Sequence, residues 1–307
     1  MENFYIIDAS AILHRSWHAL PHLKNSRGET INAVYGFTSL LLKILEQEKP
    51  HFLAITFDTK GPTFRHQVYK EYKANRISQP PEFYQQIPWL KKIIDSFDLK
   101  SFACPGLEAD DLIGALNVAK EQSPLNLKSR IITGDLDLLQ LVDPKTEVYF
   151  LQQGLKANKI YKSLDVQKRF GVAPQQIIDF KALVGDPADN IKGIKNVGPK
   201  TAAFLIQKFK NIEKIYQYLS KTKKDENLIK ESLKKELLQN KEQVLLNKRL
   251  VTIQKKAPNV TSQSIEECQV KKINTEKAFP VLKEIGLKKF SEKVKEMDQK
   301  LKQNKLF

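Results

Sequence analysis

The chain of 307 residues has only two cysteines, Cys104 and Cys268, which lie far apart in the sequence. This argues against a disulfide framework or a cysteine-based zinc site, and is typical of a reduced, cytoplasmic protein. The five histidines are scattered and also lack zinc-site spacing. No apolar run approaches the roughly 20 residues needed to span a bilayer. The first apolar run has no basic flank before it and ends at Asp8, so it predicts a strand and not a signal peptide.

Acidic residues are also in short supply. The chain has 51 Lys and Arg against 35 Asp and Glu, a formal net charge of +16 and a pI of about 9.5. Such an excess favours an anionic polymer as partner, nucleic acid first and a membrane surface second. A general lysine bias is the alternative, because Lys crowds the C-terminal third. We expect nucleic acid as the partner and no membrane association.

Short apolar runs alternate with helical patterns over the first half of the chain. The runs at 4–9, 51–58, 100–104, 130–135 and 147–152 read as buried strands, and those at 32–48, 83–97 and 108–122 as helices. This alternation predicts an α/β fold with a mostly parallel central sheet flanked by helices, which binds ligands at the carboxyl ends of its strands. After about residue 160, short helical segments punctuated by Gly and Pro predict a helical region. We therefore expect two domains, 1–170 and 171–307.

Carboxylates follow the ends of the predicted inner strands. In "RIITGDLDLLQLV" (130–142), two acids lie between a strand and a second apolar run, where ionised groups lose hydration. Helix capping explains the acids at 108–111, but does not readily explain acids at the ends of the first two strands as well. The complete set is Asp8, Asp58, Glu108, Asp110, Asp111, Asp135, Asp137, Asp186 and Asp189.

So many carboxylates cannot all remain ionised at one edge of a sheet, because mutual repulsion raises some of their pKa values. Hard divalent cations resolve the conflict, since Mg²⁺ and Mn²⁺ prefer oxygen ligands and need no His or Cys. We therefore expect an all-carboxylate site for two metal ions. In a basic protein, such a site predicts phosphodiester hydrolysis.

Two segments are candidates for holding nucleic acid. Residues 60–76 interleave basic and aromatic side chains, which track phosphates and stack on bases; a solvated basic helix is the alternative. Residues 190–209 resemble a helix-hairpin-helix, whose turn and helix start bind a phosphate through backbone amides. A P-loop is rejected, because Pro199 separates Gly198 from Lys200. The candidate nucleic-acid ligands are Arg65, Tyr69, Lys70, Tyr72, Lys192, Lys195, Gly198, Lys200 and Thr201.

Several blocks run in order along most of the first 210 residues: "HAL" with "SRGE" and "AVYGF", "GPTFRH", "EYKANR", "EADD", "ITGDLDLLQLV" and "GDPADNIKG" followed by "GPKTA". Together they resemble the bacterial 5′-nuclease family, which comprises the 5′→3′ exonuclease domain of DNA polymerase I and its flap-endonuclease relatives. The resemblance implies a PIN-like sheet domain, a helical arch at about 60–90 and a helix-hairpin-helix at about 180–210.

The resemblance also implies roles for individual residues. Asp8, Asp58, Glu108 and Asp110 would surround one metal, and Asp110, Asp135, Asp137, Asp186 and Asp189 the other, with Asp111 in or next to these sets. Lys73 and Arg76 match arch positions that act on the scissile phosphate, and Arg15 would lie near the site. The resemblance further implies a K⁺ ion at the hairpin turn. There Asn196 replaces a usual Gly and Lys192 a common Pro; because Asn tolerates a left-handed backbone, we expect the turn to survive.

We therefore predict a structure-selective 5′→3′ exonuclease and flap endonuclease that uses Mg²⁺, with Mn²⁺ as a substitute. Its substrates would be DNA with a 5′ flap, nick or branch, including RNA–DNA primer strands, during primer removal and repair. We expect a monomer in the cytoplasm, at the nucleoid. The alternatives are a non-catalytic DNA-binding protein, which leaves the acids without a purpose, and a PIN-type ribonuclease, which would lack the helical region. The start at Met1 and the lack of polymerase motifs favour a free-standing enzyme over a polymerase fragment.

Overall fold

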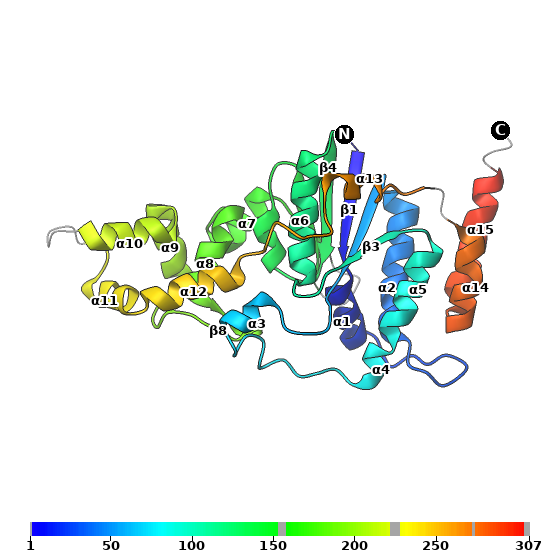
Figure 1. Cartoon of the computed structure of the whole chain (residues 1–307), viewed down its shortest axis with the longest axis horizontal. Helices are drawn as coiled ribbons and strands as arrows, with labels where there is room; N and C mark the ends of the chain where they lie inside the picture. The colour runs from blue at the N-terminus through cyan, green and yellow to red at the C-terminus, as the bar shows by residue number, and fades with distance from the viewer. Residues whose placement is uncertain (1, 153–157, 222–227, 272–273, 304–307) are drawn as a thin grey trace.

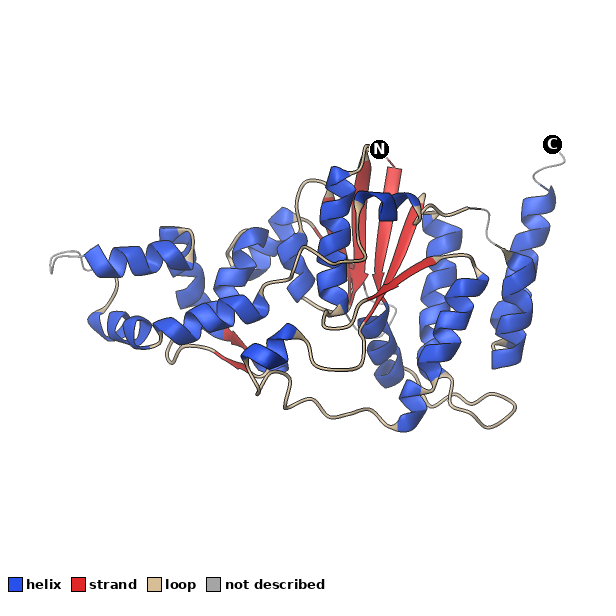
Figure 2. Cartoon of the chain, in the orientation of Figure 1, coloured by secondary structure: helices blue, strands red, loops and turns tan. Residues whose placement is uncertain are grey.

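A six-stranded sheet lies at the centre of the computed structural model, which describes residues 2–152, 158–221, 228–271 and 274–303 (Figures 1 and 2). The strand order is β3-β2-β1-β4-β5-β6. Strands β1 to β5 pair in parallel and β6 is antiparallel to β5, which confirms the predicted mostly parallel sheet. The strands are β1 (Glu2–Asp8), β2 (Phe52–Phe57), β3 (Lys100–Ala103), β4 (Leu127–Thr133), β5 (Thr146–Leu151) and β6 (Asn158–Tyr161).

Helices cover both faces of this sheet, which is why its inner strands are continuously apolar. In β1, Phe4 and Ile6 join a core with α6, whereas Tyr5 and Ile7 join a second core on the opposite face. The helices of the second face are α1 (Ala9–Ala19), α2 (Asn32–Lys43), which continues as a π-helix over Ile44–Glu48, and α5 (Gln86–Ser96). Helix α6 (Ala109–Gln122) covers the first face.

A helical region extends from the α6 side and shares its core (Figure 1). Its elements are α7 (Ser163–Phe170), α8 (Ile177–Val184), the two-stranded hairpin β7 (Gly185–Asp186) and β8 (Ile191–Lys192), α9 (Pro199–Phe209), α10 (Ile212–Lys221), α11 (Glu231–Gln239) and α12 (Lys241–Val251). The sequence predicted this change of character after residue 160.

The chain then returns to the sheet, which the sequence did not predict. After α13 (Ser262–Glu266), helix α14 (Thr275–Ile285) lies beside α5, at the other end of the molecule from α10 and α11 (Figure 1). Helix α15 (Lys288–Gln303) packs on α14 and contacts Tyr35 of α2 through Phe290. Ala278, Leu282 and Ile285 are buried in the same core as α2 and α5. The C-terminal part of the range 171–307 therefore packs on the sheet.

The segment predicted as an arch, about 60–90, contains two short helices. These are α3 (Phe64–Val68) and α4 (Pro81–Tyr84), joined by turns and extended chain that run past the carboxyl ends of the strands (Figure 2). Within the described residues, no helix has both the length and the apolar character that crossing a membrane requires.

Candidate active site

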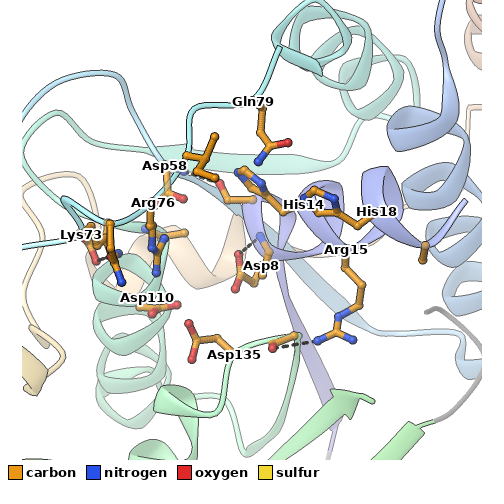
Figure 3. A pocket seen from close by; sticks show the side chains of 18 residues that line it. Asp8, His14, Arg15, His18, Asp58, Lys73, Arg76, Gln79, Asp110 and Asp135 are labelled. Carbon is orange, nitrogen blue, oxygen red and sulfur yellow. Dashed lines mark hydrogen bonds and ion pairs between the residues drawn. The ribbon is translucent and has the colours of Figure 1, made fainter. Parts of the chain in front are cut away.

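A cavity of about 840 Å³ opens at the carboxyl ends of the central strands. Figure 3 shows the side chains of Asp8, Asp110 and Asp135 converging there, with Lys73 and Arg76 beside them. The predicted site residues that line the cavity are Asp8, Arg15, Asp58, Lys73, Arg76, Glu108, Asp110 and Asp135. Residues from four parallel strand ends and from the 60–90 segment thus share one cavity, as expected for this class of sheet.

Asp8 and Asp58 are placed by the strands that they follow. Asp8 ends β1, and its carboxylate accepts the Ala11 N–H at 2.9 Å, as the N-cap of α1, and the Thr133 hydroxyl at 2.8 Å. Asp58 accepts the Ala109 N–H at 2.8 Å, at the start of α6. The expectation that capping leaves these two acids unexplained is therefore wrong: both bond to helix N-termini while they line the cavity.

Helix α6 separates two adjacent acids. Asp110 faces the cavity (Figure 3), whereas Asp111 is completely buried. Asp111 accepts two hydrogen bonds of 2.8 Å from Arg65 and further ones from the Glu108 and Gln254 backbone N–H groups. Because four donors occupy its carboxylate away from the cavity, the structure assigns Asp111 to a buried ion pair, which corrects its placement among the metal ligands.

Two predicted nucleic-acid ligands of the 60–76 segment are likewise buried. Arg65 and Tyr72 are each 3% exposed; Arg65 pairs with Asp111, and the Tyr72 hydroxyl lies 3.1 Å from Glu108 and 2.9 Å from Asp189. Tyr72 packs with residues of β8 and α12. Arg65 is too buried to track a phosphate and Tyr72 too buried to stack on a base, so these two expectations are corrected. Tyr69 is half-buried and Lys70 is exposed.

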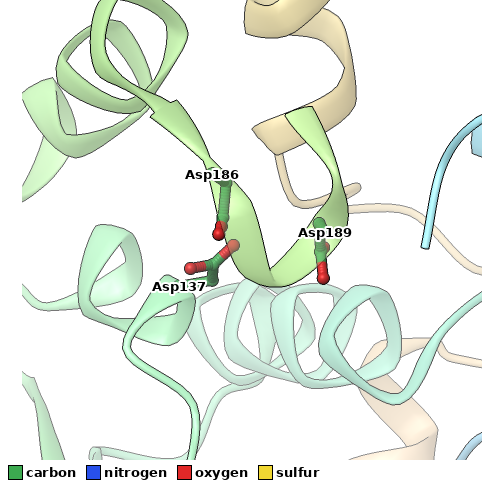
Figure 4. A group of neighbouring side chains, drawn as sticks. All are labelled: Asp137, Asp186 and Asp189. Atoms are coloured by element: carbon green, nitrogen blue, oxygen red, sulfur yellow. The ribbon is translucent and has the colours of Figure 1, made fainter. Parts of the chain in front are cut away.

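A second group of carboxylates lies next to the first. Asp137, Asp186 and Asp189 bring oxygen atoms within 4.8 Å of one another and could together hold a metal ion (Figure 4). Asp186 and Asp189 belong to the β7–β8 hairpin, which closes tightly against α8. A Cβ atom at position 193 would lie 1.9 Å from the Val184 carbonyl oxygen, so only Gly193 fits. The hairpin of "GDPADNIKG" thereby carries its acids to the sheet edge.

We call Asp8, Asp110 and Asp135 the sheet half of the acid cluster, and Asp137, Asp186 and Asp189 the hairpin half. Among the described residues, no ion pair joins an acid of the sheet half to a basic side chain. Burial and the charges of Asp58 and Asp135 raise the pKa of Asp8 to about 7. Burial and neighbouring carboxylates also raise the pKa of Asp110 and Asp135.

Basic side chains already neutralise the hairpin half. Arg76 lies 2.5 Å from Asp189, and Lys181 pairs with both Asp137 and Asp186. Lys73 bonds to Glu108 at 2.9 Å and approaches Asp189 at 3.9 Å. Although burial opposes its charge, Lys73 and Arg76 hold the pKa of Asp189 below its usual range.

Arg15 is held against the backbone beside the cavity. Its guanidinium donates to the Gln152 carbonyl at 2.7 Å. It also donates to the Gly134 carbonyl at 3.2 Å (Figure 3). A Cβ atom at position 134 would lie 2.6 Å from the Arg15 Nε atom. The glycine after β4 therefore leaves room for this cation, which lies near Asp135 without pairing to it in the described structure.

The turn of the predicted helix-hairpin-helix lies between β8 and α9, outside the cavity. Ile194 and Val197 are buried, while Lys192, Lys195, Gly198 and Lys200 are exposed and Thr201 is half-buried. Asn196 has φ of 64°, so the predicted left-handed backbone at this position is confirmed. The turn thus presents three lysines and the α9 N-terminus to solvent.

The sequence did not single out two further residues of the site. Lys181, on α8, forms the ion pairs described above, and His14, on α1, lines the cavity. A lysine in a helical pattern reads as a solvated side chain, and only the fold of α8 against the hairpin places it among acids. For His14, the available signal in the sequence is its position on the helix that begins directly after Asp8.

Comparisons with known proteins identify the family. Residues 3–171 match the family described as "5'-3' exonuclease, N-terminal resolvase-like domain", and residues 172–276 match "5'-3' exonuclease, C-terminal SAM fold". The chain belongs to the 5′-3′ exonuclease family. This confirms the family resemblance and the fold class drawn from the sequence.

Curated relatives include proteins of two lengths. The DNA polymerase I of Bacillus subtilis is 36% identical over 95% of this chain, but the match spans only 32% of that protein. The chain thus spans about a third of the DNA polymerase I relatives that it matches. The 5'-3' exonuclease of Buchnera aphidicola is 36% identical over 91% of this chain and 95% of its own length.

Solved structures share the fold at low identity. A flap endonuclease of bacteriophage T5, in complex with DNA and metal ions, aligns with a TM-score of 0.66 at 18% identity, over 97% of this chain and 99% of its own. A zinc-bound T5 5'-exonuclease aligns at 0.63 and 20% identity, over 96% and 98%. The catalytic core of Rad2 with DNA aligns at 0.60 and 17% identity, over 92% and 86%.

Proposed function

We propose that this protein is a structure-selective 5′→3′ exonuclease and flap endonuclease that hydrolyses DNA phosphodiester bonds with two divalent ions, Mg²⁺ by preference and Mn²⁺ as a substitute. One observation carries the proposal: carboxylates from four strand ends and from the β7–β8 hairpin gather at one edge of the sheet, beside cationic side chains. Membership of the 5′-3′ exonuclease family supports it.

The donor set fits hard divalent ions, because every candidate ligand is a carboxylate. Asp8, Asp58, Glu108, Asp110 and Asp135 would hold one ion, and Asp137, Asp186 and Asp189 the other. Ions bound there would supply a hydroxide for in-line attack and neutralise charge at the scissile phosphate. The positions of the acids around the cavity and the hairpin support this assignment.

Protein groups would perform the remaining steps. Lys73 and Arg76 now pair with Glu108 and Asp189, and both line the cavity, so they are placed to transfer these contacts to the scissile phosphate. Arg15, which the backbone already holds, would contact the neighbouring phosphate. Charge-assisted hydrogen bonds of this kind orient an anionic substrate and exclude water.

The exposed turn before α9 would bind the duplex. Lys192, Lys195 and Lys200 would contact phosphates together with the backbone around Gly198 and the Thr201 hydroxyl, without reading sequence. Exposed Lys70 and half-buried Tyr69 would contact the strand that passes the 60–90 segment. A K⁺ ion at the turn carbonyls belongs to the same proposal.

The biological substrates would be DNA with a 5′ flap, nick or branch and RNA–DNA primer strands, in primer removal and repair. The neighbours solved with DNA support a DNA substrate. We propose a monomer that acts at the cytoplasmic nucleoid, with a catalytic domain over 1–170 and a DNA-binding region after it. Flap DNA should be cut in preference to single-stranded RNA, which a PIN-type ribonuclease would favour.

The test replaces both acids that follow β4. Asp135→Asn with Asp137→Asn should abolish Mg²⁺-dependent cleavage of a 5′-labelled flap and spare duplex binding, measured by fluorescence anisotropy. Asp95→Asn, the same change at an exposed acid of α5 outside the cavity, is the control and should retain activity. Continued Mg²⁺-dependent cleavage by the double variant would overturn the proposed site.

A further inference from the structure

Lys181 lies among the acids of the hairpin half. Its ammonium lies 2.7 Å from an Asp186 carboxylate oxygen and also pairs with Asp137. The lysine side chain is 15% exposed, and the two carboxylates are 14% and 11% exposed. Three elements meet in this contact, since Lys181 belongs to α8, Asp137 follows β4, and Asp186 belongs to β7. It is therefore a partly buried, three-residue ion network and not a surface pair.

The carboxylates that Lys181 contacts belong to the set that could hold a metal. Asp137, Asp186 and Asp189 bring ligand atoms within 4.8 Å of one another. A divalent ion needs the lone pairs of these oxygens, and an ammonium that donates hydrogen bonds to the same oxygens competes with it for them. Among the described residues, Asp8, Asp110 and Asp135 of the sheet half form no such ion pair, although the neighbouring Glu108 pairs with Lys73 at 2.9 Å.

We propose that Lys181 is a built-in counter-ion of the hairpin half, which neutralises Asp137 and Asp186 in the metal-free protein and competes with a divalent ion for them. This inference rests on the proposed two-ion function and adds to it a residue that sets the affinity of one half. The two halves then bind ions unequally: the sheet half binds directly, and the hairpin half binds only when the Lys181 ammonium withdraws.

Replacement of Lys181 has two opposite consequences. Lys181→Met removes the charge and keeps much of the side-chain volume, so the metal-free protein retains two carboxylates, Asp137 and Asp186, without a cationic partner and becomes less stable. The same carboxylates are then free for a divalent ion. We expect the weaker of two Mn²⁺-binding steps to tighten at least tenfold, while the tighter step stays unchanged.

The experiment is calorimetric titration of the metal-free 307-residue chain with Mn²⁺ alone, together with its thermal melting. Lys181→Met should show the tighter second step and a lowered melting temperature that Mn²⁺ restores. Lys181→Arg retains the charge and should keep the second step weak. Lys214→Met makes the same charge change at an exposed lysine of α10 and should match the unmodified protein.

An unchanged second step in Lys181→Met, or an equal change in both steps, would overturn the inference. If Lys181→Met does not fold, Lys181→Gln, which can donate a hydrogen bond to Asp186 without a charge, carries the same expectation. Failure of the proposed function looks different: the unmodified protein would bind no Mn²⁺ and cut no flap DNA, and the inference would fall with it. Two binding steps and flap cleavage with no effect of Lys181→Met would overturn the inference alone.

Discussion

The two halves of the acid cluster differ in how their charge is compensated. Asp8, Asp110 and Asp135 lie at strand ends and at the start of α6, where burial and mutual repulsion raise their pKa values and no basic side chain pairs with them in the described structure. Asp137, Asp186 and Asp189 lie beside the hairpin, where Lys181 and Arg76 already neutralise them.

This difference separates two ways of storing negative charge in a folded protein. In the sheet half, the carboxylates repel one another and no basic side chain pairs with them in the described structure. This repulsion lowers stability until a cation binds. The hairpin half uses the chain's own cations, so it is stable without metal but must exchange partners before it binds one. Lys73 and Arg76 take part in that exchange, since a phosphate in the cavity would compete for them.

The largest predicted effect is on catalysis, when one carboxylate is removed from each half in turn. Asp110→Asn takes a ligand from the half whose acids have no paired basic side chain in the described structure, and should lower kcat for flap cleavage by more than about 100-fold, beyond the usual cost of losing an outer-shell partner. Asp189→Asn removes an acid whose charge Arg76 already offsets, so we expect a smaller loss. Single-turnover rates at saturating Mg²⁺ measure both. Equal losses, or a greater loss for Asp189→Asn, would remove the distinction between the halves.

The two adjacent acids of α6 also differ in compensation, and this difference can be tested through the stability of the protein. Asp110 faces the cavity, but Asp111 pairs with Arg65, and Arg65 also donates to the Leu250 and Thr252 carbonyls at the C-terminal end of α12. Arg65→Met should therefore lower the free energy of unfolding by about 3–5 kcal/mol, because it leaves Asp111 buried without its cation. Urea denaturation measures this change.

Arg65→Lys is the informative companion variant. A lysine keeps the charge but cannot form the two-pronged contact or reach both carbonyls, so it should recover only part of the lost stability. Mn²⁺ affinity should change little in either variant. If Arg65→Met were as stable as the unmodified protein, the ion pair would not be the link between α3, α6 and the end of α12.

The sequence predicted the fold class and most of the site because both follow from local pattern. Apolar runs that end in Asp8, Asp58 and Asp135 specify parallel strands whose carboxyl ends share an edge, and this edge gathers the acids without further information. Family membership confirms the fold class. The left-handed turn at Asn196 could also be predicted, because it depends on one residue's backbone preference.

Features that depend on long-range packing could not be predicted. Asp110 and Asp111 are chemically identical neighbours, and only the position of α3 and of the chain after α12 decides which one is buried. Arg65 and Tyr72 read as surface residues because their partners are up to 187 positions away in the sequence. The return of α14 to α5 and the contact of Lys181 with Asp137 have the same origin, since no local pattern encodes a distant partner.

The smallest predicted effect is on the pH dependence of stability, to which Asp8 of the sheet half and Asp189 of the hairpin half contribute with opposite signs. The pKa of Asp8 is 3.8 ordinarily and about 7 in the folded, metal-free protein. Between these values the folded state binds more protons than the unfolded state, so the metal-free protein should lose stability as pH rises from about 4 to about 7. Asp189, whose pKa is lowered, acts in the opposite direction and loses its contribution as pH falls through the acid range.

Thermal melting of the metal-free protein between pH 5 and pH 8 measures this trend. Asp8→Asn should flatten it, and because Asn also caps helices well, α1 retains its N-cap. Saturating Mg²⁺ should reverse the trend in the unmodified protein, since metal binding requires deprotonated carboxylates and so strengthens as pH rises. An equal pH slope in the unmodified protein and in Asp8→Asn would show that Asp8 does not carry the unresolved charge of the sheet half.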